Sequence, residues 1–123
     1  MSIRESGEMY LETILILSRS SSEVHSIDVA DYMNVSKPSV SRAVGILKNA
    51  GYIVTGKDNS LVLTDMGLEA AERIYDRHIT IAEMLRSLGV SEENAVNDAC
   101  KMEHDISEET FLAFKKHLKE HFE

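Results

Sequence analysis

The sequence contains a single cysteine and a single proline, has no tryptophan, and lacks any long apolar run. Cys100 therefore has no partner for an internal disulfide, which fits a reducing compartment and leaves its thiol for packing, metal or redox chemistry. No apolar stretch approaches the roughly 20 residues that a bilayer-spanning helix requires. The polar start MSIRESGEMY is unlike a signal peptide. These absences predict a cytoplasmic protein that does not enter a membrane.

An excess of acidic residues gives the chain a net charge of −8, which by itself argues against a nucleic-acid ligand. The charge is unevenly distributed, because residues 1–60 carry six Lys and Arg against seven Asp and Glu, whereas residues 61–123 carry seven against fourteen. Within the first half, Lys37, Arg42 and Lys48 lie in a segment that has no acidic residue. This local basic stripe keeps DNA open as a partner.

Apolar spacing and capping residues predict three helices and a hairpin in the first half of the chain. Helical periodicity covers residues 5–18. Capping and turn residues then delimit two shorter helices, with N-caps at Ser26 and Ser36, a stop near Asn34, Pro38 in a first turn and an end at Gly51. The β-branched segments YIVTG and LVLT flank the turn-rich KDNS, which predicts a β-hairpin. This order is that of a winged helix-turn-helix DNA-binding domain.

The second half carries only helical patterns. A long helix is expected up to about Ser87, a second one up to about His104, and a last one after it. The residues that start or stop these helices are Thr64, Gly89, Ser91 and Ser107. The predicted fold is therefore mostly α, with a winged helix-turn-helix DNA-binding domain over residues 1–64 and an α-helical domain over residues 65–123.

Polar side chains on the outward face of the third predicted helix, and one at the hairpin tip, are candidates for DNA contacts. They are Ser36, Lys37, Ser39, Ser41, Arg42, Lys48 and Lys57. Hydroxyl groups can donate to and accept from base edges, an arginine can bond guanine through two nitrogens, and a lysine can contact phosphate. The alternatives are that these residues only solvate an exposed helix, or that the winged helix binds a protein.

Cys100, Glu103 and His104 occupy positions i, i+3 and i+4, so a helix places them on one face. Thiolate, carboxylate and imidazole together suit a borderline divalent first-row ion better than magnesium or calcium. Candidates for the remaining ligands are Met9, Glu12 and His78. Each residue alone also has an ordinary explanation as core filling or as a solvated charge.

With these motifs together, the chain resembles the diphtheria toxin repressor family of iron- and manganese-dependent regulators. The resemblance lies in EMYLETI, VADYMNVSKPSVSRAVGILKNAGYI, LVLTDMG and DACKMEHDIS. It implies a two-domain form without the family's SH3-like domain, in which residues 65–123 form the dimerisation and metal-binding domain, and a homodimer that binds palindromic operator DNA. It also implies Fe(II) or Mn(II) as the cofactor, with Co(II), Ni(II) or Zn(II) able to substitute in vitro.

The resemblance also assigns ligands. Met9, Cys100, Glu103 and His104 match the primary metal site of the iron-responsive branch, whereas Glu12 and His78 match ligands of the manganese-responsive branch. That second branch has carboxylates at the positions of Met9 and Cys100, so the set in this chain is mixed.

Two second-site positions of the iron branch hold Ala82 and Val96 here, which predicts that this additional site is lost in its usual form. In the recognition helix the matching residues are Ser36, Lys37, Pro38, Ser39 and Arg42. Arg42 replaces a glutamine of the iron-responsive prototype, which predicts a changed base preference.

The resulting hypothesis is a metal-dependent repressor, not an enzyme, in which a metal ion links the first helix to the dimerisation domain. The dimer contact is expected to include Phe111, Phe114 and Leu118. One alternative is a metal-independent winged-helix regulator that responds to an organic ligand or to the redox state of Cys100. Another is a metalloenzyme, which the lack of a separate acid–base pair or nucleophile motif disfavours.

Overall fold

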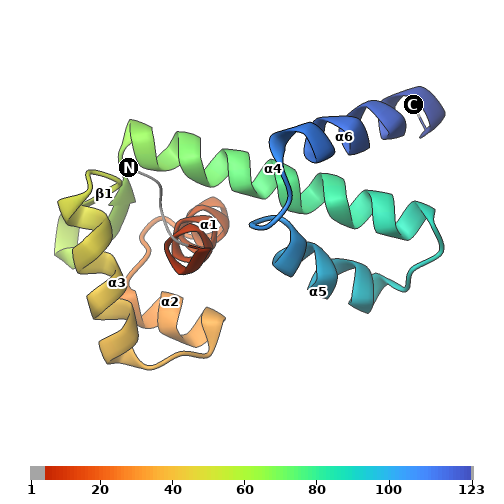
Figure 1. Cartoon of the computed structure of the whole chain (residues 1–123). Helices are drawn as coiled ribbons and strands as arrows, with labels where there is room; N and C mark the ends of the chain where they lie inside the picture. The colour runs from red at the N-terminus through yellow and green to blue at the C-terminus, as the bar shows by residue number, and fades with distance from the viewer. Residues whose placement is uncertain (1–4, 123) are drawn as a thin grey trace. The chain divides into compact units, whose positions relative to one another are not determined.

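The structure is a computed structural model and describes residues 5–122. It divides into two compact units, of which the first ends at Glu72 and the second begins at Arg73. The elements, shown in Figure 1, are α1 (Glu5–Ser20), α2 (Ser26–Met33), α3 (Lys37–Asn49), β1 (Ile53–Thr55), the 3-10 turn η1 (Lys57–Asn59), β2 (Leu61–Leu63), α4 (Asp65–Ser87), α5 (Glu92–Met102) and α6 (Glu108–Phe122). In the described range no helix has the length and apolar character needed to cross a membrane.

An apolar core holds the first unit together. It is built from α1, α2, α3 and the two strands, with the deepest side chains at Leu11, Ile14, Val29, Val40, Leu47 and Ile53. Within α1 and α3 the buried positions are three and seven residues apart, because each helix turns one apolar stripe inward. Burying side chains of this size stabilises a fold by roughly 1.5–3 kcal/mol each. The mostly helical class and the winged helix-turn-helix arrangement are confirmed.

The turn between α2 and α3 follows the predicted chemistry with one correction. Asn34 adopts the left-handed conformation at φ 57°, and Ser36 caps α3 by accepting a hydrogen bond from the Ser39 backbone at 3.3 Å. The N-cap of α2, however, is His25 and not the predicted Ser26. The Asp28 carboxylate accepts the backbone N–H of His25 at 2.9 Å, and this bond moves the helix start back by one residue.

The hairpin is confirmed as an antiparallel pair in which Ile53 faces Leu63 and Thr55 faces Leu61. Its connection to α4 is tight. The Thr64 hydroxyl donates to the carbonyl of Gly51 at 2.7 Å and accepts the N–H of Gly67 at 3.1 Å, so it caps α4 as predicted. A Cβ atom at Gly67 would collide with the backbone carbonyl of Tyr52, so only glycine fits there without a shift of the main chain.

The second unit has its own small core. Ile81 and Ala82 of α4 pack with Ala99 of α5, and Leu85, Met102, Ile106 and Phe114 surround them. Phe111 is also buried, at 4% exposure, beneath the guanidinium of Arg77 at 5.2 Å from the ring centroid. The expectation that Phe111 lies in a dimer contact is therefore wrong, because its ring is covered by its own chain.

Candidate metal centre and DNA-reading helix

The N-terminal half of α3 presents polar side chains outward from a well-anchored helix. Val40, Val44 and Leu47 are buried and fix the helix, whereas Arg42 is exposed on its opposite face. The other predicted DNA-contacting residues of α3 that are exposed are Ser36, Lys37, Pro38, Ser41 and Lys48. The stripe of Lys and Arg thus faces solvent, where phosphates can reach it.

Two of the predicted serines are partly occupied by the helix cap. Ser36 Oγ lies 2.8 Å from Ser39 Oγ, in addition to accepting the N–H of Ser39. Ser39 is half-buried. These hydroxyls therefore fix the helix start, and a base contact by either would have to share the bonds of the cap.

The hairpin tip places Lys57 in solvent at the start of η1. Asp58 and Asn59 both adopt positive φ, at 54° and 62°, which short polar side chains tolerate. The tip is tied to the helix-turn-helix by His25, whose Nε2 lies 3.2 Å from the Asp58 carbonyl oxygen. This contact fixes the position from which Lys57 projects.

Three potential metal ligands converge in the second unit. One donor atom each of His78, Cys100 and Glu103 lies within 4.8 Å of the others. His78 Nδ1 is 3.7 Å from Cys100 Sγ and 3.3 Å from Glu103 Oε2. The helical spacing aligns Cys100 with Glu103, while α4 contributes His78.

Glu103 is the buried centre of this cluster, with 3% of the residue exposed. Its Oε1 lies 3.3 Å from His104 Nε2, and both side chains are almost fully buried. Its Oε2 accepts no well-aligned hydrogen bond, although His78 Nδ1 is close. A buried carboxylate is costly unless positive charge lies beside it.

The positive charge comes from His78 in this structure. The Cys100 side chain first, and then the Glu103 carboxylate 3.3 Å away, raise the pKa of His78 from 6.5 to about 10, against the opposing effect of burial. The imidazole is thus held in its charged form at neutral pH. In the metal-free chain the proton on His78 Nδ1 supplies this positive charge. A metal cation held by the same nitrogen, sulfur and oxygen atoms would displace that proton and supply the charge instead.

The donor set fits a divalent transition ion. It combines nitrogen, sulfur and oxygen atoms, of which only the Glu103 carboxylate is buried, and one oxygen of that carboxylate accepts no well-aligned hydrogen bond from the protein. Magnesium and calcium prefer shells made only of oxygen, so the thiol of Cys100 argues against them.

Arg77 is a residue of this site that the sequence reasoning missed. Its Nη1 donates to the backbone carbonyls of Glu103 at 3.1 Å and Ile106 at 3.0 Å, and its Nη2 donates to Glu108 Oε2 at 3.0 Å. The guanidinium therefore holds the turn that carries Glu103. The only signal in the sequence was an arginine directly before His78.

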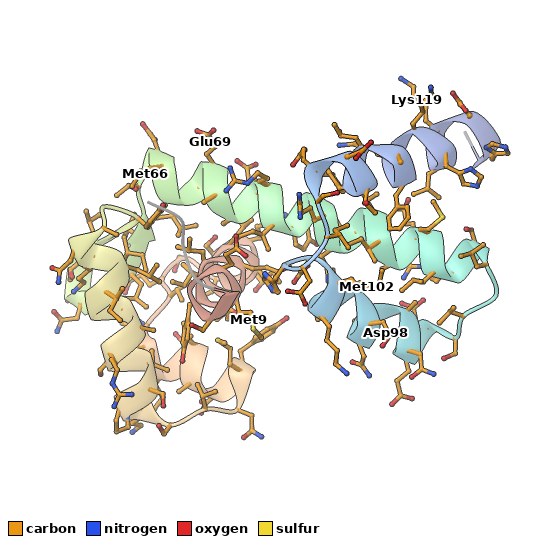
Figure 2. All side chains as sticks on the ribbon, in the orientation of Figure 1. Met9, Met66, Glu69, Asp98, Met102 and Lys119 are labelled. Atoms are coloured by element: carbon orange, nitrogen blue, oxygen red, sulfur yellow. The ribbon has the colours of Figure 1, made fainter. Side chains whose placement is uncertain are left out.

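The other predicted ligands are placed as follows. His104 lies one residue beyond the cap of α5, since the helix ends at Met102 and Glu103 is its C-cap, so the expected helix up to His104 is slightly too long. Met9 and Glu12 lie on α1 in the first unit, where Met9 is exposed and Glu12 is buried. Figure 2 labels Met9 on that helix. The role of Met9 and Glu12 as ligands stays a prediction.

Two family models match the chain and together cover nearly all of it. The model described as "Iron dependent repressor, N-terminal DNA binding domain" matches residues 2–61. The model described as "Iron dependent repressor, metal binding and dimerisation domain" matches residues 64–121. The helix-turn-helix thus lies in the match to the DNA-binding domain, and the side-chain cluster around Glu103 lies in the match to the metal-binding and dimerisation domain.

Curated relatives agree with the family models. The "Transcriptional regulator MntR" of Escherichia coli O6:H1 is 36% identical over 118 residues, which are 96% of this chain and 76% of the relative. The "HTH-type transcriptional regulator MntR" of Geobacillus kaustophilus is 36% identical over 102 residues, which are 83% of this chain and 72% of the relative.

Solved structures show the same fold. The structure of the manganese regulator SloR matches with a TM-score of 0.81 and 26% identity, over 97% of this chain and 55% of that one. The metal-dependent transcriptional regulator MtsR matches with a TM-score of 0.86 and 27% identity, over 92% of this chain and 53% of that one. The chain therefore spans about half the length of these solved proteins.

Proposed function

The chain belongs to the iron-dependent repressor family, and we propose that it is a transcriptional repressor that binds operator DNA as a homodimer when loaded with Fe(II) or Mn(II). Its relatives are manganese- and iron-dependent regulators, which supports control of metal homeostasis. The role proposed for the first unit is reading DNA through α3 and the hairpin. The role proposed for the second unit is sensing the metal and forming the dimer.

The observation that carries the proposal is the buried carboxylate of Glu103 between two imidazoles and beside a thiol. A bound ion would supply the positive charge that balances this acid. Nδ1 of His78 would release its proton to solvent and would hold the ion together with the sulfur of Cys100 and one oxygen of Glu103. Arg77 would keep Glu103 in register through the main chain.

The proposed ligand set is wider than the cluster in the second unit. It includes Met9, Glu12, His78, Cys100, Glu103 and His104. Met9 and Glu12 enter on the resemblance alone, and His104 enters through its contact with Glu103. A thiolate favours softer ions such as Fe(II), whereas the carboxylates favour harder ones such as Mn(II), so both ions stay within the proposal.

On the DNA side, the proposal gives α3 the major groove and Lys57 an adjacent phosphate. Two recognition helices of a homodimer would then read half-sites about 34 Å apart, one helical repeat of the duplex. Without the metal ion, the protein would lose more conformational entropy when it binds DNA and would therefore bind DNA more weakly.

Affinity for DNA with and without metal tests the function. A fluorescent duplex is first selected from a random-sequence pool by the protein in the presence of Fe(II) or Mn(II). Its dissociation constant is then measured anaerobically with each ion and with chelator. We expect binding about 5- to 150-fold tighter with the correct ion, since coupling energies between sites are typically 1–3 kcal/mol.

A matched pair of substitutions links that response to the cluster. Glu103→Gln removes the buried charge and should abolish the response to metal, whereas Glu93→Gln changes an exposed carboxylate on the same helix and should leave it intact. Equal DNA affinity with ion and with chelator would refute metal control. A normal metal response in Glu103→Gln would show that the sensing site lies elsewhere.

A further inference from the structure

The spacing of Cys100, Glu103 and His104, at and just beyond the end of α5, recurs on α6. Residues 100–104 read CKMEH and residues 117–121 read HLKEH, so both segments have a donor at i, glutamate at i+3 and histidine at i+4. On a helix, residues at i, i+3 and i+4 lie on one face. The second segment differs from the first in carrying imidazole in place of the thiol and in its exposure to solvent.

The two histidines of α6 are already side by side. The rings of His117 and His121 stack with centroids 4.1 Å apart and an interplanar angle of 25°. His121 Nδ1 lies 3.0 Å from the backbone oxygen of His117. Both side chains are exposed, so an ion in solution can reach them without opening the core.

Glu120 lies on the same face of α6, and a change of its rotamer can bring its carboxylate close to the two histidines. Its Oε1 is 3.9 Å from Lys116 Nζ in an exposed pair, an arrangement that contributes little to stability. The carboxylate can therefore leave Lys116 for a stronger partner at small cost. Lys119 projects outward from the same stretch of α6, as Figure 2 shows.

We propose that His117 and His121, with Glu120 as a third donor, form an accessory surface site for nitrogen-preferring divalent ions such as Ni(II), Cu(II) and Zn(II). Two histidines at i and i+4 on one helical face are a recurrent arrangement for binding a metal. Water molecules would complete the coordination shell of the ion, because the three side chains are exposed to solvent. Imidazole selects these ions over Mn(II), which prefers oxygen.

The site differs from the cluster around Glu103 in strength and selectivity. It is exposed and lacks a thiolate, so its ion exchanges readily. A bound ion would cross-link two successive turns near the end of α6 and hold this terminal segment in helical form. The chain would thus carry one buried site and one open site with different metal preferences.

Calorimetric titration of Ni(II) into the metal-free full chain tests the proposal. We expect two ions per wild-type chain and one ion per chain in the double variant His117→Gln/His121→Gln. Lys119→Ala, on the same helical segment, serves as the control and should still bind two. Mn(II) should bind one fewer ion per wild-type chain than Ni(II).

Thermal unfolding followed by circular dichroism gives a second readout. Ni(II) should raise the midpoint less in the double variant than in wild type. If the cluster around Glu103 binds no ion, the wild type takes up one Ni(II) ion and the double variant none. Failure of the site around Glu103 is therefore distinguishable from failure of the site on α6. The proposal is overturned if the double variant binds as many Ni(II) ions as the wild type.

Discussion

The two units of the molecule place their functional side chains in opposite environments. In the first unit the candidate DNA-contacting residues stand in solvent on a helix that an apolar core holds in place. In the second unit the candidate metal ligands include buried charged groups, above all Glu103. Substitutions on the exposed face of α3 can therefore leave the fold undisturbed, whereas the buried groups around Glu103 are part of what the fold has to stabilise.

The largest contrast is expected in the stability of the metal-free chain. Glu103→Ala removes the buried carboxylate that faces His78 and His104, and should lower the free energy of unfolding by about 3 kcal/mol. Arg42→Ala alters an exposed side chain and should change it by less than about 0.5 kcal/mol. Urea unfolding of both variants measures the difference. Equal losses of unfolding free energy in the two variants would contradict the proposed difference between the two units.

A smaller loss is expected when the support of the ligand turn is removed. Arg77→Ala deletes the bonds to two backbone carbonyls and should weaken metal binding roughly 10- to 100-fold, the usual cost of an outer-shell partner. Arg77→Lys keeps one charged donor, so its metal affinity should lie between those of the wild type and Arg77→Ala. Competition with a fluorescent chelator gives the affinities, and an unchanged value for Arg77→Ala would remove this residue from the site.

The pH dependence of metal affinity comes next. Because the pKa of His78 is about 10 in the metal-free chain, metal binding at neutral pH has to displace its proton. Affinity should rise about tenfold per pH unit between pH 6 and 8, and His78→Gln should have a flatter profile. A wild-type affinity that does not change over this range would contradict the coordination of His78.

The same shift has a sign for stability. The folded pKa lies above the ordinary value of 6.5, so charged His78 stabilises the metal-free fold fully below pH 6.5. This stabilisation is lost as the pH rises towards 10. Urea unfolding of the metal-free chain across that window should show the decline in wild type and less of it in His78→Gln.

The smallest effect is expected at the wing. Lys57→Ala should weaken DNA binding only several-fold and lower the slope of log affinity against log salt by about one, as for a single phosphate contact. Folding should not change, because Lys57 is exposed. Fluorescence anisotropy over a salt series measures this slope. A change in sequence preference would mean that Lys57 reads bases.

Local chemistry explains why most of the fold was predictable. Asn34, Ser36 and Ser91 act through groups within a few residues of the chain, as does Thr64 in its cap of α4, and all four play the predicted part. The start of α2 was misplaced because His25 and Asp28 compete with Ser26 for the same turn. That competition is decided by which side chain reaches the free N–H, and the sequence does not show it.

The site was only half predictable for a different reason. Periodicity aligned Cys100 with Glu103, but the distance from either to His78 depends on how α4 packs against α5. The burial of Glu103 and the grip of Arg77 follow from the same long-range packing. Phe111 shows the limit most clearly, since an aromatic residue on an amphipathic helix gives no sign of whether its own chain or a partner covers it.

The way Arg77 holds the turn from Glu103 to Ile106 also bears on which substitutions this turn tolerates. Its guanidinium grips the carbonyl oxygens of Glu103 and Ile106, groups that every amino acid carries. Asp105 between them is exposed, so mutations there alter the charge next to the ligands while the grip is retained. Substitutions at Asp105 can therefore adjust the electrostatics around the candidate ligands while the turn keeps its geometry.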